Sequence, residues 1–230
     1  MSEKNNNVAI AKGASEQPSP PLANALRRAV FLLGAARVKQ FPGDSGWEVA
    51  VAGRSNAGKS SAINVITGIR GLARISKTPG RTREINFFQI DPERRLVDLP
   101  GYGYARVPLP VRQAWARLID DYFRQRRSLR GVMLVMDCRH PLTEFDQQML
   151  MWCEYSRLPA HILLTKADKL SHGAAKAVLH KVRSQLIHPP QENRDISVQL
   201  FSALKRVGVA EAQEILAAWM EFEIKKGPGL

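Results

Sequence analysis

One stretch of the sequence, GRSNAGKSSAINVITG at residues 53–68, constrains the fold more than any other. It follows the apolar run EVAVA and leads into a helix-like pattern, so its glycines, lysine and serines lie where a strand becomes a helix. Such a turn points several backbone N–H groups into one concavity, in front of the positive end of the helix dipole. Glycine lets the backbone approach an anion without a Cβ in the way. The spacing therefore predicts a phosphate-binding loop.

The side chains of this loop have different expected roles. Lys59 is expected to contact the β- and γ-phosphates of a nucleotide, and the hydroxyl of Ser60 is expected to bind Mg²⁺. The other residues expected to surround the phosphates are Gly53, Arg54, Ser55, Asn56, Ala57, Gly58 and Ser61.

Apolar, strand-like segments alternate with helical segments along the rest of the chain. This order predicts an α/β fold, a doubly wound and mostly parallel six-stranded sheet with one antiparallel strand and helices on both faces. Residues 84–90 and 94–100 are expected to form its hairpin around the turn at residues 91–93. Residues 22–41 predict a lead-in that is either a helix or a helix followed by a strand. We expect a disordered tail at residues 1–21, a single domain at residues 22–225 and a short tail at residues 226–230.

Polar motifs follow three of the predicted strands, at the edge where ligands of such sheets bind. Asp98, after one strand, can hold Mg²⁺ through its water shell, and the N–H of Gly101 can approach a γ-phosphate. Asp168, after another strand, can accept both N–H donors on one edge of guanine, and adenine cannot match that pattern. Each motif alone is also compatible with an ordinary turn or a helix cap. The complete set is Asp98, Leu99, Pro100 and Gly101; Thr165, Lys166, Ala167 and Asp168; and Phe201, Ser202 and Ala203.

Five motifs in this order, GRSNAGKSS, KTPGRT, DLPGYGYA, TKAD and FSAL, resemble those of the EngB-type (YihA/YsxC) bacterial GTPases. These belong to the translation-factor-like (TrmE-Era-EngA-YihA-Septin-like) superfamily of P-loop GTPases, and the resemblance extends from about Ala25 to Trp219. It implies a Ras-like fold that binds GTP, GDP and Mg²⁺ and hydrolyses GTP slowly. It also implies a role in assembling the large ribosomal subunit (50S) and in normal cell division and septation.

The resemblance also assigns roles position by position. The second motif centres on Thr82, which with Ser60 would be a direct ligand of Mg²⁺, while Asp98 would act through water. The residues around Thr82 that would contact the nucleotide are Gly80, Arg81, Arg83 and Glu84. The residues implied to act in hydrolysis are Lys59, Thr82 and Gly101.

Three positions of this sequence stand out against other GTPases, and the first two bear on how fast GTP is hydrolysed. Tyr102 stands where many GTPases have a glutamine that orients the attacking water, and a phenol lacks the paired donor and acceptor of an amide. We therefore expect slow intrinsic hydrolysis with help from elsewhere. Asn56 is one candidate source, because some GTPases without the glutamine use an asparagine here to bind K⁺; it is equally compatible with a residue that only shapes the turn. Thr165 stands where general GTPases have an asparagine, and its hydroxyl can still tether the loop.

The charge of the chain favours a polyanionic partner. Thirty-four Lys and Arg against twenty-one Asp and Glu leave a net charge of +13. The resemblance implies large-subunit rRNA and ribosomal proteins as partners. We also expect no DNA specificity, no membrane anchor, a monomer and a cytoplasmic location. Arg81, Arg83 and Arg106 are expected either to contact RNA phosphates or to be solvated. The arginines at residues 124–130 suit the negative end of a helix dipole.

Two other functions remain compatible with the same motifs. One is a P-loop nucleotide or small-molecule kinase, which would need a second substrate pocket and a lid. The other is a GTPase switch associated with the membrane or the septum.

Overall fold

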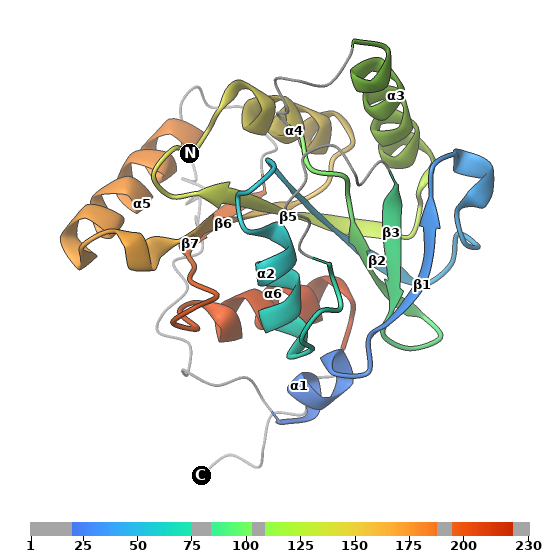
Figure 1. The fold of residues 1–230 in the computed structure, drawn as a ribbon, viewed down its shortest axis with the longest axis horizontal. Helices are drawn as coiled ribbons and strands as arrows, with labels where there is room; N and C mark the ends of the chain where they lie inside the picture. Colours follow the sequence, from blue (N-terminus) through green and yellow to red (C-terminus); the bar gives the residue numbers. More distant parts are fainter. Residues whose placement is uncertain (1–19, 75–83, 103–108, 188–194, 223–230) are drawn as a thin grey trace, which may run out of the picture.

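A seven-stranded sheet forms the centre of the molecule in the computed structural model, which describes residues 20–74, 84–102, 109–187 and 195–222 (Figure 1). The strand order is β1-β3-β4-β2-β5-β6-β7. All neighbouring strands are parallel except that β3 runs antiparallel to both β1 and β4, so the fold class predicted from the sequence is confirmed. The strands are β1 (Val30–Ala35), β2 (Trp47–Gly53), β3 (Ile85–Gln89), β4 (Arg94–Asp98), β5 (Leu129–Asp137), β6 (Ala160–Thr165) and β7 (Ile196–Leu200).

The prediction of six strands was one strand short, and the additional strand is β1. It is the second half of the lead-in that the sequence left open between a helix and a helix followed by a strand. The apolar run from Val30 to Leu33 has no period that separates the two. Pairing with β3 decides the matter, since Val30 lies opposite Gln89 and Ala35 opposite Ile85.

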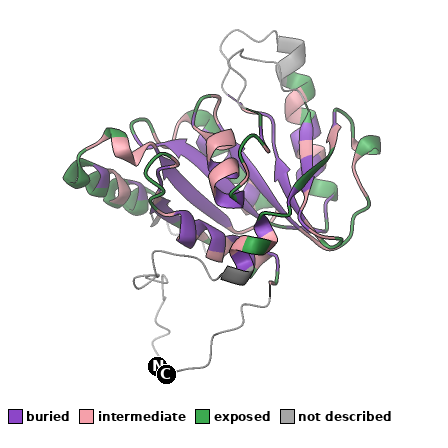
Figure 2. Ribbon diagram, turned by 60° about the horizontal axis from the view of Figure 1, so that its bottom comes forward, coloured by how far each residue is buried: buried purple, intermediate pink, exposed green. Residues whose placement is uncertain are grey.

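Helices cover both faces of the sheet, as predicted, because consecutive strand residues point to opposite sides. Ala50 and Ala52 belong to the core cluster that α3, α4 and α5 cover, whereas Val49 and Val51 belong to the cluster under α1, α2 and α6. Figure 2 shows the buried residues concentrated in the central strands, with α5 mostly exposed. The helices are α1 (Pro20–Leu26), α2 (Lys59–Thr67), α3 (Leu109–Gln125), α4 (Glu144–Tyr155), α5 (His172–Ile187) and α6 (Val209–Trp219), with short 3₁₀ helices η1 (Val38–Gln40) and η2 (Ala167–Lys169).

A buried ionic cluster lies at the end of the sheet opposite the predicted phosphate loop. Glu48, at the start of β2, is fully buried and accepts hydrogen bonds from Arg95 Nη1 (3.1 Å) and Arg126 Nε (3.1 Å). The hydroxyl of Tyr122 lies 3.3 Å from the same carboxylate. Arg126 therefore has a structural role, and it follows the C-terminal end of α3, where the sequence placed the arginine cluster.

The predicted tails at the two ends of the chain lie almost entirely outside the described residues. The helix α1 begins at Pro20, two residues before the predicted start of the domain, and residues 1–19 and 223–230 lie outside the described part of the chain. Within the described ranges, no helix is both long enough and apolar enough to span a membrane.

Candidate functional site

The predicted phosphate loop connects the end of β2 to the start of α2. Asn56 and Gly58 both have positive φ values, 61° and 103°, which produce the tight turn, and the second of these is a conformation that favours glycine. The N–H of Ala57 donates to the carbonyl of Arg54 (3.0 Å), and the N–H of Ala62 donates to the carbonyl of Gly58 (2.8 Å). The helix therefore begins directly at the loop, with its positive end facing the concavity.

Gly53 has a role that sequence reasoning did not give it. A Cβ at this position would lie 2.6 Å from the carbonyl oxygen of Val135, on the neighbouring strand β5. This glycine therefore allows β2 and β5 to pack where the loop begins. At Gly58 a Cβ would meet Thr165 only at an ordinary contact distance of 3.7 Å, so backbone conformation is what favours glycine there.

Lys59 and Asp98 form an ion pair at the mouth of the loop, and both side chains are largely buried. Asp98 ends β4, which pairs with β2 so that Asp98 lies opposite Val51. Ser60, the next residue of α2, donates its hydroxyl to the carbonyl of Arg74 (3.3 Å). The structure thus joins the lysine and the carboxylate that the sequence assigned to phosphates and Mg²⁺, whereas the hydroxyl of Ser60 contacts the carbonyl of Arg74.

The third motif lies directly against the phosphate loop. The N–H of Ser55 donates to the carbonyl of Tyr102 (2.9 Å), and a Cβ on Gly101 would lie 3.5 Å from the nitrogen of Ser55. Leu99 and Pro100, between Asp98 and Gly101, are buried. The backbone of Gly101 is therefore close to the loop, as its predicted contact with a γ-phosphate requires.

The side chain of Tyr102 is anchored on α4 and α3. Its hydroxyl donates to Oδ1 of Asp146 (2.8 Å), whose other carboxylate oxygen caps α4 by accepting from the N–H and the hydroxyl of Thr143. The ring centroid lies 6.2 Å from those of Trp115 and Phe145. Burial, followed by the negative charge of Asp146, raises the pKa of Tyr102 well above its usual value, so the phenol stays neutral. The ring of Tyr102 therefore packs on protein.

Thr165 and Lys166 of the fourth motif bind the phosphate loop. The hydroxyl of Thr165 lies within hydrogen-bonding distance of the carbonyls of Ala57 and Met136, and its single proton can be donated to one at a time. The ammonium of Lys166 donates to the carbonyl of Asn56 (2.7 Å). The hydroxyl that replaces the usual asparagine therefore still tethers this loop.

The carboxylate that the sequence predicts to recognise the base is held by the fifth motif. Asp168 lies in η2 and is half-buried, and its Oδ1 accepts a hydrogen bond from the hydroxyl of Ser202 (2.5 Å). That hydroxyl in turn accepts from the N–H of Lys205 (3.0 Å), and the N–H of Ala167 donates to the carbonyl of Phe201 (3.2 Å). The loops after β6 and β7 therefore orient the carboxylate as one unit. Ala203 follows in the same loop.

Asp137 is a site residue that sequence reasoning missed. It is buried at the end of β5, 2.9 Å from the ammonium of Lys166, and it accepts two side-chain hydrogen bonds from Arg139 (2.9 and 2.6 Å). Burial opposes its ionisation, but the hydrogen bonds from Arg139 and Lys166 prevail and hold the pKa of the carboxyl well below its usual value. The sequence feature that could have identified Asp137 is its position at the end of an apolar strand. Its effect is to fix Lys166 beside the loop.

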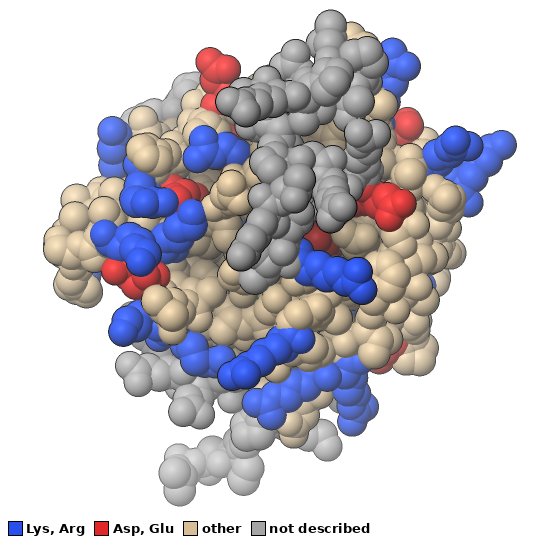
Figure 3. All heavy atoms as spheres, viewed as in Figure 1, with Lys and Arg blue, Asp and Glu red and all other residues tan. Residues whose placement is uncertain are grey.

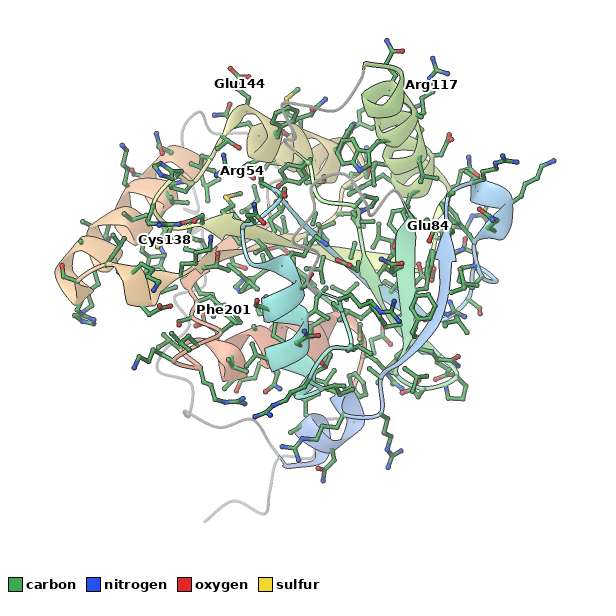
Figure 4. All side chains as sticks on the ribbon, in the orientation of Figure 1. Arg54, Glu84, Arg117, Cys138, Glu144 and Phe201 are labelled. Atoms are coloured by element: carbon green, nitrogen blue, oxygen red, sulfur yellow. The ribbon has the colours of Figure 1, made fainter. Side chains whose placement is uncertain are left out.

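Not all the predicted residues come together. Figure 4 shows Arg54 and Phe201 on the side of α2, whereas Glu84 lies apart, at the start of β3. Glu84 is exposed, and its carboxylate lies beside Gly34 of β1. Gly80, Arg81, Thr82, Arg83 and Arg106 lie outside the described residues, so the second Mg²⁺ ligand and its arginines stay predictions.

Comparison with protein families identifies one model that matches the chain. It is described as "50S ribosome-binding GTPase", and it matches residues 48–166, just over half of the chain. This range contains the phosphate loop, the third motif and the start of the fourth, up to Lys166.

Solved structures of other GTP-binding proteins share the fold. A probable GTP-binding protein EngB is similar with a TM-score of 0.61 and 21% identity, over 76% of this chain and 98% of that one. A variant of Era from Aquifex aeolicus bound to GDP·AlF4⁻ has a TM-score of 0.58 and 18% identity, over 76% and 57% of the two chains. A bacterial selenocysteine-specific elongation factor has a TM-score of 0.55 and 21% identity, but the match covers 77% of this chain and only 29% of that longer protein.

Proposed function

Because the chain belongs to the family of 50S ribosome-binding GTPases, we propose that it binds the large ribosomal subunit when it carries GTP and leaves after hydrolysis. That it is a GTP-binding P-loop GTPase follows from the family itself. The proposal concerns its partner, its metal ions, its rate and its place in subunit assembly. The observation that supports a guanine-nucleotide switch is that the loops carrying Asp168 and Ser202 are hydrogen-bonded to each other beside the phosphate loop, where the carboxylate would recognise guanine.

The residues at the mouth of the loop fit a magnesium ion. Mg²⁺ prefers oxygen ligands and keeps several of its waters. The hydroxyl of Ser60 and the carboxylate of Asp98 supply such oxygens, and Thr82 would supply another. Bound Mg²⁺ would neutralise charge on the β- and γ-phosphates. Lys59 can exchange its ion pair with Asp98 for the phosphates, which leaves the carboxylate to accept hydrogen bonds from metal-bound water.

Slow hydrolysis is expected from the position of Tyr102. Its hydroxyl is engaged with Asp146 and its ring is buried, so this side chain is not placed to orient a water at a γ-phosphate. The exposed side chain of Asn56, at the tip of the loop, is available to bind K⁺ beside the phosphates. We propose this as one source of acceleration. Single-turnover hydrolysis measured in KCl and in NaCl at equal ionic strength tests it, and equal rates would remove K⁺ from the proposal.

Sedimentation with ribosomal subunits tests the proposed partner. Purified 50S particles and assembly intermediates should carry the protein through a sucrose cushion with a non-hydrolysable GTP analogue, and much less with GDP. Because phosphate contacts release counterions, the bound fraction should fall steeply as salt is raised. Binding that is the same with GTP analogue, with GDP and without nucleotide would contradict the proposal.

The role in cell division and septation belongs to the same proposal as a later consequence of subunit assembly. Depletion of the protein should change the sucrose-gradient profile of large-subunit precursors before it changes the frequency of septa. If septa are lost while subunit profiles remain normal, the division role is separate.

A further inference from the structure

The edge strand β1 exposes apolar side chains, which is unusual for the edge of a sheet. Val30 and Phe31 are each 58% exposed and Leu32 is 39% exposed, in consecutive positions. The strand pairs with β3 on one side, and no described strand pairs with it on the other. Exposed apolar side chains on an edge strand are typical of an interaction surface.

The geometry of this edge disfavours the addition of another strand. The register of β1 against β3 shifts between Phe31 and Leu33, so Leu32 forms a bulge. Bulges interrupt the regular ladder of backbone groups that an added strand requires. A partner is therefore expected to contact the side chains of this edge rather than its backbone.

The charge around this edge favours a polyanion. Residues 20–43 contain no Asp or Glu, and Figure 3 shows Lys and Arg gathered on the lower part of the molecule over α1 and the end of α2. The neighbouring strand β3 has one carboxylate near each end. Asp91 is paired with Arg94 (3.1 Å), and Glu84 lies beside Gly34, at the other end of β1 from Val30. The exposed basic residues of this segment are Arg27, Arg28, Arg37 and Lys39.

Phe31 is held in position by the fold, and Arg27 lies near the end of α2. The ring of Phe31 packs edge-to-face on the buried ring of Phe88, with centroids 6.0 Å apart, and still leaves more than half of its own surface exposed. The Nε of Arg27 lies 3.2 Å from where a Cβ of Gly68 would be, next to the C-terminal end of α2. The arginines lie three and four residues before Phe31 in the chain. An aromatic ring together with arginines supplies the groups that bind unpaired bases by stacking and their phosphates by charge.

We propose that Arg27, Arg28, Val30, Phe31 and Leu32, the β1 edge surface, bind single-stranded RNA. A base stacks on the ring of Phe31, and Arg27 and Arg28 bind the adjacent phosphates. This inference rests on the proposed binding to the ribosomal subunit and names the part of the protein that contacts its RNA.

Fluorescence anisotropy with the full chain tests the surface directly. The probe is a labelled uridine-rich RNA of about twelve unpaired nucleotides. Phe31→Ala should weaken binding by roughly tenfold, whereas Phe31→Trp should preserve it, because stacking needs an aromatic ring. The double variant Arg27→Gln, Arg28→Gln should reduce the slope of log affinity against log salt by about 1.4, since each phosphate contact to a single strand contributes about 0.7.

Matched control variants distinguish RNA binding at this surface from non-specific RNA binding elsewhere on the protein. Tyr155→Ala removes another exposed aromatic ring, 74% exposed on α4, and should leave RNA binding unchanged. Lys176→Gln with Lys181→Gln removes the same amount of charge from exposed positions on α5 and should leave most of the affinity. A duplex of the same sequence should bind less well, because its bases are already stacked.

Several outcomes would overturn the inference. Equal RNA affinity of Phe31→Ala and wild type would exclude stacking, and equal losses in the charge control would leave only non-specific attraction. A dimer in sedimentation equilibrium that Phe31→Ala abolishes, without any effect on RNA, would assign the surface to a second copy. Normal sedimentation of Phe31→Ala and the arginine variant with 50S particles would overturn this inference alone, whereas failure of the wild type to sediment with GTP analogue would overturn the proposed function.

Discussion

At the scale of single residues, the carboxylate of Asp168 and the hydroxyl of Ser202 lie on loops that follow different strands, and they meet across 2.5 Å. A carboxylate that is held by a neighbour keeps its orientation without rotational freedom. This is the arrangement needed to accept two parallel hydrogen bonds from a base, so base choice should depend on Asp168 and affinity on Ser202.

Asp168→Asn should change which purine is bound. An amide at this position donates where the carboxylate accepted, so guanine nucleotides should lose roughly 10²- to 10⁴-fold in affinity while xanthine nucleotides gain. Titration with fluorescent guanine, xanthine and adenine nucleotides measures this. Ser202→Ala is the matched control: it should weaken guanine binding by about fivefold, without a gain for xanthine. Wild-type protein that binds ATP as tightly as GTP would contradict the assignment.

Tyr102→Phe should destabilise the fold and leave catalysis nearly unchanged. The variant removes the hydrogen bond to Asp146, which costs about 1–2 kcal/mol of unfolding free energy in a buried site. Urea denaturation gives that loss, and single-turnover GTP hydrolysis should stay within about twofold of wild type. A large fall in the hydrolysis rate, with little change in stability, would instead give the hydroxyl a catalytic role.

At the scale of elements, a buried histidine joins β6 to β7. His161 Nδ1 lies 2.7 Å from the hydroxyl of Ser197, and Nε2 lies 2.7 Å from Oε1 of Gln199, whose amide nitrogen donates to the carbonyl of Gly208. This chain of contacts is satisfied by a neutral imidazole that donates from Nε2 and accepts at Nδ1. Burial lowers the pKa of His161 to about 4.

Stability should therefore fall as the pH is lowered from about 6.5 towards 4. In that window the unfolded chain binds a proton at His161 and the folded chain does not, so acid favours unfolding. The loss should reach about 2 kcal/mol at pH 5. Urea unfolding between pH 7.5 and 5 measures it. His161→Asn should flatten the dependence, and His180→Asn, at an exposed position, should not; a wild type with no slope in this range would refute the prediction.

The last helix, α6, packs on the sheet where β5 has a glycine, which leaves room for a tryptophan ring. A Cβ added at Gly131 would lie 2.6 Å from the ring of Trp219, at the end of α6. Gly131→Ala should force the ring or the helix to move and cost about 1–3 kcal/mol, seen as a lower urea midpoint and a shifted tryptophan emission. Gly173→Ala, in α5 with no atom within 4 Å of the added carbon, should be neutral or slightly stabilising. Equal effects would show that packing at Trp219 is not the cause.

At the scale of the whole molecule, one buried cluster connects segments far apart in the chain. Glu48 at the start of β2 contacts Arg95 of β4, Arg126 after α3 and Tyr122 within α3. The buried ionic cluster and the nucleotide site thus lie at opposite ends of the same strands.

Glu48→Gln should test how much of the fold depends on that cluster. The amide removes the charge that faces Arg95 and leaves Arg126 with only the carboxylate of Asp44, 3.8 Å away, which costs roughly 3–5 kcal/mol. Denaturant unfolding measures the loss, and protein that remains folded should keep its guanine-nucleotide affinity. Asp120→Asn breaks the exposed pair with Arg124 and should give no measurable change. A comparable loss in both variants would contradict the importance of burial.

The sequence by itself determined the chemistry of the site and the class of the fold. Lys59, Ser60 and Asp98 could be recognised because a phosphate loop depends on residue types at fixed spacing, and such spacing is visible in a linear chain. Strand ends were visible for the same reason, since apolar runs stop where the sheet stops, and this placed Asp168 and Ser202 on neighbouring loops.

Only the tertiary structure decided which distant residues are partners. Several contacts join segments that no periodicity in the sequence connects. They are the hydrogen bond of Tyr102 to Asp146, the ion pair of Asp137 with Lys166, the pairing of β1 with β3 and the burial of Glu48 with two arginines. The physical reason is that a polar or charged side chain is compatible with water in any isolated segment. Its partners are selected only when packing removes that water and leaves a few groups within hydrogen-bonding distance.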